Sequence, residues 1–236
     1  MLIAVSLADY IPLITTIVAS VFTILLIWQY AHRRKIHQAI WTLAMALYAV
    51  SAFMEYLANP DVMGPSVTLI KIYYVCTAPL VGLLGSGVLY LLVRRKVANA
   101  YLAIVVILSL ALLVGGGSAD LSEEDIAAVF EEGLREGFGE ASTSFPFVAA
   151  RLPAILLNST GGTLLIGGAL YSYVRDRSRT YNIFLILGGL FPFIGGTLLG
   201  IFHYPYVFFE FELAGTVFLF LGFVMSMRYL RRRERR

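Results

Sequence analysis

Seven polar side chains lie in or beside strongly apolar stretches of this sequence, where ionisable groups are costly and usually have a function. They are Glu55, Lys71, Arg151, Asn158, His203, Glu210 and Glu212. The five charged residues fall at a similar depth below the same side of the predicted bundle, so we expect them to form one polar layer, and His203 and Asn158 are nearby candidates for the same site. Carboxylates and cations gathered in such a layer can pair with one another, or they can line a pocket for a polar ligand.

Two arrangements of this layer agree with the sequence. One is a set of interhelical ion pairs and of long side chains that reach the outer headgroups. The other is a ligand-binding pocket that opens to the outside. Glu210 and Glu212 are two positions apart on a helix, so they point to nearly opposite sides and only one can face a pocket. We expect one of these glutamates to pair with Arg151 or Lys71, because unpaired charges are costly in an apolar layer.

Several kinds of reaction centre are not predicted. An opsin carries its Schiff-base lysine in the seventh helix, and residues 206–229 contain no lysine. The histidines are His32, His37 and His203, and no two are placed to hold a haem between helices. Cys76 is the single cysteine, so it cannot form a disulfide within the chain. We therefore expect no cofactor, no metal and no enzymatic activity.

The elements that must position the polar layer are long apolar segments. The chain is 59% hydrophobic and has a mean hydropathy of +0.80, well above soluble domains. About 20 apolar residues cross a bilayer core of about 30 Å. The predicted spans are 9–31, 36–58, 66–93, 97–117, 144–174, 181–203 and 206–230. We expect an all-α membrane protein, in which residues 1–236 form a single domain of seven transmembrane helices.

The loops between these spans alternate in charge. The basic ones contain Arg33 to Lys35, Arg94 to Lys96, Arg175 to Arg179 and Arg231 to Arg236. The loops between them hold no Lys or Arg, except Arg135 in a strongly acidic one. Because basic loops stay on the cytoplasmic side, the pattern predicts an outer N-terminus and a cytoplasmic C-terminus. We expect a multi-pass protein of the plasma membrane.

The acidic segment 118–142 is the longest stretch between two spans. Ser122 followed by three acidic residues is a good helix N-cap with a favourable dipole. Ile126, Val129, Phe130 and Leu134 then recur at helical spacing. The pattern predicts a short amphipathic helix outside the membrane. Its acidic residues can attract cations, although a solvated surface is the more common explanation of such a run.

Small residues and a faint repeat shape the second half of the chain. Glycine pairs such as Gly161-Gly162 and Gly188-Gly189 favour close helix packing, or a dimer interface through these helices. The same interval separates Arg34 from Pro60 and Arg179 from Pro205. Each interval holds a basic loop, an apolar span and an outer turn. This indicates a parallel repeat of three helices, a linker helix and three helices.

The second and third spans resemble a known family. Residues 44–57 (AMALYAVSAFMEYL) and 69–75 (LIKIYYV), followed by Pro79, resemble the seven-helix sensor region at the N-terminus of many prokaryotic histidine kinases. The resemblance implies a seven-helix bundle that senses a ligand. In those kinases a coiled coil and catalytic domains follow the seventh helix, whereas this sequence ends at Arg236. If the kinship holds, signalling must pass to a separate partner.

Our first hypothesis is therefore a receptor- or sensor-like protein of a prokaryotic plasma membrane, with a polar pocket facing outward. We expect this cavity to be closed by apolar and glycine-rich packing towards the cytoplasm. The alternatives are a small-solute transporter or channel of the three-plus-one-plus-three type, or a structural subunit of a membrane complex. The expected partners are membrane lipids, an unknown small ligand, a cytoplasmic or membrane partner protein and a second copy of the chain. No nucleic acid is expected, because membrane insertion explains the basic loops.

Overall fold

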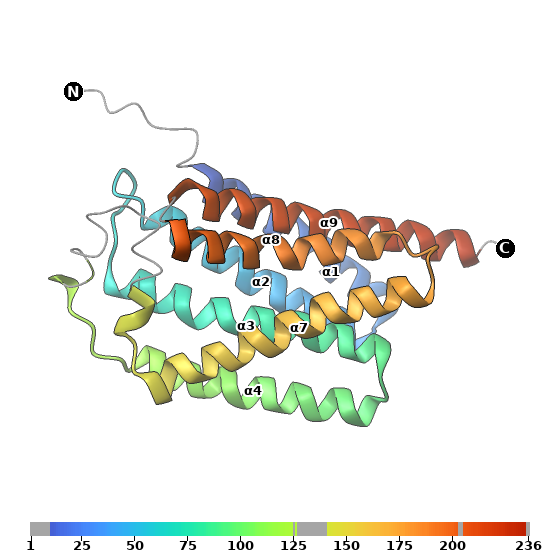
Figure 1. The fold of residues 1–236 in the computed structure, drawn as a ribbon, viewed down its shortest axis with the longest axis horizontal. Helices are drawn as coiled ribbons and strands as arrows, with labels where there is room; N and C mark the ends of the chain where they lie inside the picture. The colour runs from blue at the N-terminus through green and yellow to red at the C-terminus, as the bar shows by residue number, and fades with distance from the viewer. Residues whose placement is uncertain (1–9, 125, 127–140, 203–204, 235–236) are drawn as a thin grey trace.

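The computed structural model describes residues 10–124, 126, 141–202 and 205–234, and all its longer elements are α-helices (Figure 1). The helices are α1 (Ile11–Arg33), α2 (Ile36–Leu57), α3 (Val67–Leu92), α4 (Arg95–Gly117), α7 (Leu152–Arg175), α8 (Tyr181–Phe202) and α9 (Pro205–Glu234). Within the described residues, six helical segments are long and apolar enough to cross a membrane, and α8 holds a shorter apolar stretch, Tyr181–Gly196. The chain is thus a multi-pass helical membrane protein.

The ends of the helices follow from local sequence signals. Pro12 lies in the first turn of α1, where a missing N–H is harmless. The Ser66 side chain caps α3 by accepting a hydrogen bond from the Leu69 N–H at 3.4 Å. Arg34 ends α1 in the left-handed conformation, with φ of 50°, and so allows the tight turn into α2. Most predicted boundaries agree with the helices to within a few residues.

The largest difference lies at the start of the fifth span, which we expected at residue 144. The chain first makes a 3-10 turn at Ser142–Ser144 and a π-helical turn at Phe147–Arg151. The regular α-helix begins only at Leu152. Pro153 explains the late start, because a residue without an N–H is tolerated in the first turn of a helix but not in its interior.

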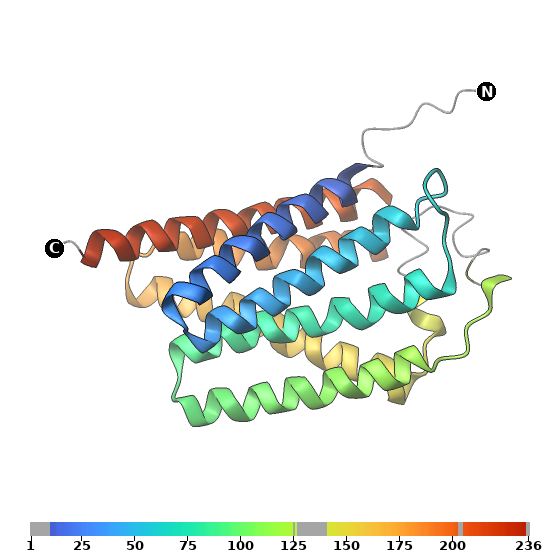
Figure 2. The same cartoon turned by 180° about the vertical axis from the view of Figure 1, so that it is seen from behind.

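Among the helices named above, all except α4 form a closed ring. Each of α1, α2 and α3 packs against the next, and so do α7, α8 and α9. The ring closes where α3 meets α7 and where α1 meets α9 (Figures 1 and 2). α4 lies outside the ring against α3 and α7, and it exposes large side chains such as Ile107 and Val114. α4 is therefore peripheral and turns an apolar surface away from the ring.

Glycines bring the helices into close contact, as the sequence predicted. A Cβ atom on Gly161 of α7 would lie 2.3 Å from the carbonyl oxygen of Val81 in α3. A Cβ atom on Gly85 of α3 would lie 2.7 Å from the carbonyl oxygen of Gly161. The backbones of the two halves of the chain therefore touch here, because neither residue carries a side chain. The internal repeat and the dimer interface stay predictions.

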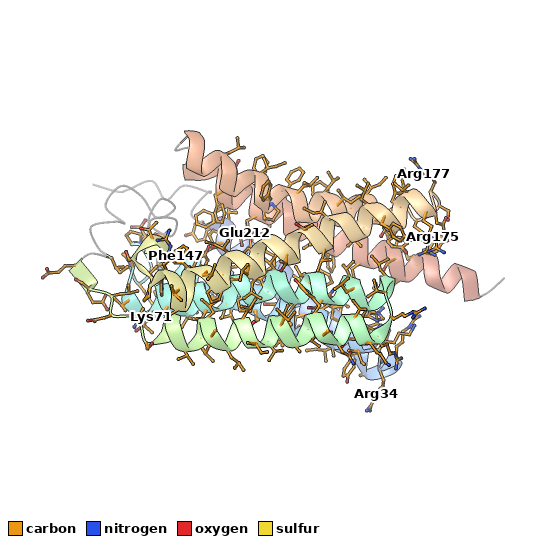
Figure 3. All side chains as sticks on the ribbon, turned by 60° about the horizontal axis from the view of Figure 1, so that its bottom comes forward. Arg34, Lys71, Phe147, Arg175, Arg177 and Glu212 are labelled. Carbon is orange, nitrogen blue, oxygen red and sulfur yellow. The ribbon has the colours of Figure 1, made fainter. Side chains whose placement is uncertain are left out.

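The basic loops gather at one end of the bundle. Figure 3 shows Arg34, Arg175 and Arg177 at the end opposite to Lys71 and Phe147. We call the end formed by residues 33–35, 94–96 and 175–179 the basic end. The structure describes the beginning of the acidic segment at the other end. There the Ser122 hydroxyl accepts a hydrogen bond from the Glu124 N–H at 3.2 Å, which confirms the predicted N-cap.

The remainder of the predicted amphipathic helix lies outside the described residues, which omit 125 and 127–140. Ile126 is buried against the hydrophobic core of the bundle. The Glu123 carboxylate accepts a hydrogen bond at 3.1 Å from the Val67 N–H at the start of α3. The first turn of the acidic segment is thus held against the bundle.

Candidate functional site

Three helices each turn one continuous face towards the inside of the ring. On α2 this face holds Gln38, Trp41, Met45, Tyr48, Ala52 and Glu55. On α9 it holds Glu212, Thr216, Leu219, Phe223 and Ser226, and on α1 it holds Thr15, Ala19, Phe22, Leu26 and Gln29. Spacings of three and four residues place each set on one side of its helix. Each face is polar at both ends and apolar in the middle.

A cavity of about 290 Å³ occupies the basic end of the ring. Its walls come from α1, α2, α3, α7, α8 and α9, and α4 contributes no lining residue. The apolar part of the wall includes Phe22, Trp41, Met45, Leu219 and Phe223. The polar part includes Gln29, Gln38, Ser172, Asn182 and Ser226. This size is near the lower limit of about 300 Å³ for small-molecule sites, so the cavity suits a small solute.

Hydrogen bonds hold several of the cavity's polar groups in place. The Asn182 side-chain amide donates to the Ser172 hydroxyl at 3.1 Å and so ties α8 to α7. The Trp41 indole N–H donates to the Leu84 carbonyl at 3.2 Å and ties α2 to α3. Gln38 and Asn182 are each 3% exposed. The cavity therefore presents preformed amide groups beside an aromatic wall.

The rim of the cavity is cationic. Arg33, Lys35 and Arg179 supply its positive charge, and no acidic residue lies among the described lining residues. Asp176, just outside the lining, accepts a hydrogen bond from the Arg179 Nε at 2.9 Å. Hydrogen bonds from Ser178 and from Arg179 hold the pKa of Asp176 below its usual range. Arg179 is thus partly neutralised, and the net charge around the mouth is positive.

An apolar layer separates the cavity from a second polar group farther along the axis. The rings of Phe22 and Phe223 pack with centroids 5.0 Å apart, next to buried Met45 and Leu219. Beyond them, the Tyr48 hydroxyl of α2 donates to the Glu212 backbone carbonyl of α9 at 3.3 Å. The Thr216 hydroxyl donates to the same carbonyl at 2.9 Å. The Tyr48 bond joins α2 to α9 across the ring, whereas the Thr216 bond lies within α9.

The second polar group is a pair of buried carboxyl side chains. Glu55 is 0% exposed and Glu212 is 6% exposed. The two side chains act electrostatically on each other, and the Tyr48 and Tyr73 hydroxyl groups lie beside them. Among the described residues, no hydrogen bond reaches either oxygen of the Glu55 carboxyl group or the Oε2 atom of Glu212. We call Glu55 and Glu212 the carboxyl pair.

The expected ion pairs are not formed by the described residues. Lys71 Nζ instead donates to the Gly117 carbonyl at the end of α4, at 3.2 Å. The Arg151 guanidinium donates to the Thr143 carbonyl at 3.5 Å and lies 5.7 Å from the Phe147 ring centre. Lys71 and Phe147, the residue whose ring Arg151 contacts, lie near the end of the bundle, whereas Glu212 lies deeper inside (Figure 3). Long cationic side chains reach polar groups at such an end.

The other described residues of the predicted layer, Glu210 and Asn158, lie away from the carboxyl pair. Glu210 is exposed while Glu212 is buried, as their spacing of two residues predicts. Asn158 is exposed on α7. His203 lies outside the described residues. The structure thus brings together two members of the predicted layer, the carboxyl pair, and leaves Lys71, Arg151, Asn158 and Glu210 away from it.

The cavity at the basic end was not predicted, because ionisable residues are the usual sequence signal of a site within a membrane and this cavity is lined mostly by uncharged ones. We expected an opening on the opposite side and apolar packing here. The cavity could have been predicted from Gln29, Gln38 and Asn182, because each stands on an inward face among apolar residues. A polar amide at such a position needs a partner or a water-filled space.

No family model, no curated protein and no solved structure matches this chain. The resemblance to the sensor regions of histidine kinases therefore stays a prediction. The geometry itself identifies the chain as an all-helical, multi-pass membrane protein with a cavity at its basic end and a buried carboxyl pair farther along the same axis.

Proposed function

We propose that the protein is a small-solute transporter and that the cavity at the basic end is its solute-binding site. The observation that carries this proposal is the position of the cavity between two three-helix units, α1–α3 and α7–α9, both of which supply wall residues. A site between two such units becomes accessible from either side when the units rock against each other. The chain is then a non-enzymatic protein.

The charge pattern supplies the orientation of the proposed transporter. Basic loops favour the cytoplasmic side of a plasma membrane, so the cavity opens inward in the present conformation. The apolar layer of Phe22, Met45, Leu219 and Phe223 closes the route towards the outside. In the proposed transport cycle these side chains move and open the route of the solute to the outside.

The lining of the cavity supports a small organic anion as solute. A positive rim without acidic lining residues favours a negatively charged group. Gln29, Gln38 and Asn182 offer hydrogen-bond donors and acceptors, and Trp41 offers an apolar face. Membrane insertion alone explains the loop charges, but it does not explain three buried amides behind them.

The receptor hypothesis loses support because it needs a pocket at the opposite end of the bundle. It required apolar packing at the basic end, where the cavity lies. A receptor that senses a solute from the cytoplasm would bind in the same cavity without carrying the solute across. A transporter and such a receptor would therefore both bind the solute, and only the transporter would carry it across the membrane.

Transport in liposomes tests the proposal. A panel of small carboxylate, phosphate and sulfonate compounds is first screened for compounds that raise the unfolding temperature of the purified protein. Each compound that binds is then tested for saturable uptake into liposomes that contain the protein. Asn182→Ala should weaken binding by about tenfold or more, which is about 1.4 kcal/mol, and should reduce uptake.

Asn158→Ala is the matched control, because Asn158 is an exposed asparagine on a neighbouring helix. It should leave both binding and uptake unchanged. Binding that is lost in Asn182→Ala without any uptake in the parent protein would replace the transporter by a cytoplasm-facing sensor. Equal effects of the two substitutions would show that the cavity is not the binding site.

A further inference from the structure

The carboxyl pair lacks the partners that buried carboxylates need. Glu55 is fully buried, and neither of its carboxyl oxygens has a hydrogen-bond partner among the described residues. Glu212 Oε2 is buried and without a partner as well. Thr15, on the inward face of α1 at the same end of the bundle, is 1% exposed and its hydroxyl also has no partner. Four oxygen atoms are thus buried without a hydrogen bond.

Two negative charges cannot persist side by side in this position. An isolated ionised carboxylate is very costly in an apolar environment, and a second one nearby adds repulsion. The cations that might have neutralised the pair, Lys71 and Arg151, bind backbone carbonyls nearer the end of the bundle. Something bound between the two carboxyl groups must therefore supply the positive charge.

The surroundings favour a proton over a metal ion. Calcium takes six to eight oxygen ligands, and magnesium demands an octahedral set. Among the described residues, no group of three or more His, Cys, Asp or Glu side chains could hold a metal ion. The titratable groups that face the pair are the hydroxyls of Tyr48 from α2 and Tyr73 from α3. α1 contributes Thr15, and α8 has no ionisable residue beyond Tyr181 at the basic end.

We infer that Glu55 and Glu212 form a binding site for a single exchangeable proton. With the proton bound, one carboxyl group is neutral and can share its hydrogen with the other. On release, the O–H bond breaks, the proton passes to water as hydronium, and the pair carries one more negative charge. A carboxylic acid and a carboxylate at short distance stabilise this one-proton state, as in other coupled pairs of carboxyl groups.

The inward faces connect this proton site to the cavity. Glu55 stands on the same face of α2 as Gln38, and Glu212 stands on the same face of α9 as Ser226. The axis of α2 rises by roughly 25 Å between Gln38 and Glu55. Cavity and proton site together therefore extend along most of the membrane. If the proposed transport holds, this is the site that couples solute movement to a proton, and a proton would balance the charge of an anionic solute.

Infrared spectroscopy tests the proton directly and needs no solute. The purified full chain in lipid nanodiscs is titrated in water and in deuterium oxide. We expect a carbonyl stretching band of a protonated carboxyl group that shifts on deuteration and fades as the pH rises. The Glu55→Gln/Glu212→Gln double variant should lack this band. Glu210→Gln, which changes an exposed carboxylate on the same helix, should keep it.

The glutamine variants preserve the size of each side chain, and a single symmetrical peak in size-exclusion chromatography checks that they fold. Absence of the band in the parent protein, or its presence in the double variant, would overturn the inference. A metal cation bound by the pair would also overturn the inference. In that case sodium, potassium or calcium, added at constant ionic strength, would raise the unfolding temperature of the parent protein and not that of the double variant.

The outcomes separate this inference from the proposed function. A proton band without solute uptake removes the transporter and leaves the proton site. Uptake in a protein that lacks the band removes the proton site and leaves the transporter. If both hold, uptake should depend on a pH gradient in the parent protein. Glu55→Gln should then lower that dependence at least tenfold, and Glu210→Gln should not change it.

Discussion

At the scale of single residues, a glycine in α3 allows the Trp41 side chain of α2 to form part of the cavity wall. The indole of Trp41 lies over Gly87 of α3 and donates its N–H to the Leu84 carbonyl. A Cβ atom on Gly87 would stand 2.0 Å from the Trp41 Nε1 atom. The indole can therefore occupy its position only because residue 87 has no side chain.

Gly87→Ala should displace the Trp41 indole and break its hydrogen bond to Leu84. Overpacking of this kind typically costs about 1–3 kcal/mol, and the displaced ring would also narrow the cavity. Unfolding followed by denaturant titration should show the loss, and tryptophan fluorescence in a Trp28→Phe background should report the changed environment. Adding Trp41→Phe should restore part of the stability, because the smaller ring leaves space for the new methyl group. No rescue by this second substitution would contradict the proposed contact.

At the scale of helices, the crossing of α3 and α7 joins the two halves of the ring through backbone contact. Gly161 touches the Val81 carbonyl, whereas a Cβ atom on its neighbour Gly162 would meet nothing within 4 Å. These adjacent glycines share the same helix and similar sequence surroundings. They therefore separate the effect of helix packing from that of helix propensity.

Gly161→Ala should destabilise the protein by about 1–3 kcal/mol, because α3 and α7 must move apart. Gly162→Ala should be neutral or stabilising by up to about 1 kcal/mol, since alanine favours a helix over glycine. Unfolding of both variants in the same detergent measures the difference. Equal stability of the two variants would show that the close crossing does not exist.

The same scale explains what the sequence could predict. Hydropathy predicts the apolar helices well, because a membrane core demands about 20 apolar residues whatever their partners are. The fifth span was predicted to begin at residue 144, whereas its helical structure begins at Phe147 with a π-helical turn, because Pro146 and Pro153 reshape its start. The sequence also identified Glu55 and Glu212 as buried in one layer. It could not assign their neighbours, because depth along a helix is readable from the sequence whereas the direction of each helix face depends on packing.

At the scale of the whole molecule, all basic loops lie at one end and the described start of the acidic segment lies at the other. A single orientation in the membrane therefore decides on which side the cavity opens. The alternation of loop charge predicts that the basic end faces the cytoplasm. The prediction therefore assigns one orientation to the whole molecule, including the cavity and the loops.

Labelling with a membrane-impermeant thiol reagent measures the orientation. In a Cys76→Ala background, Ser122→Cys should react in intact cells, because the acidic segment is expected outside. Ser178→Cys, in the basic loop between α7 and α8, should react only after lysis. The opposite pattern would turn the cavity to the outside, where it could bind an external solute, and would contradict the topology predicted from the loop charges.

The apolar layer between the cavity and the carboxyl pair also has an electrical consequence. Water in the cavity has nearly the same electrical potential as the solution on the side to which the cavity opens. Most of the membrane voltage therefore falls across the layer around Phe22 and Met45. An elementary charge that crosses a potential of 100 mV gains or loses about 2.3 kcal/mol. A proton that moves between the carboxyl pair and the cavity thus crosses most of the field within a few helical turns. The membrane voltage then acts on this one short step, and movement of the proton generates a current.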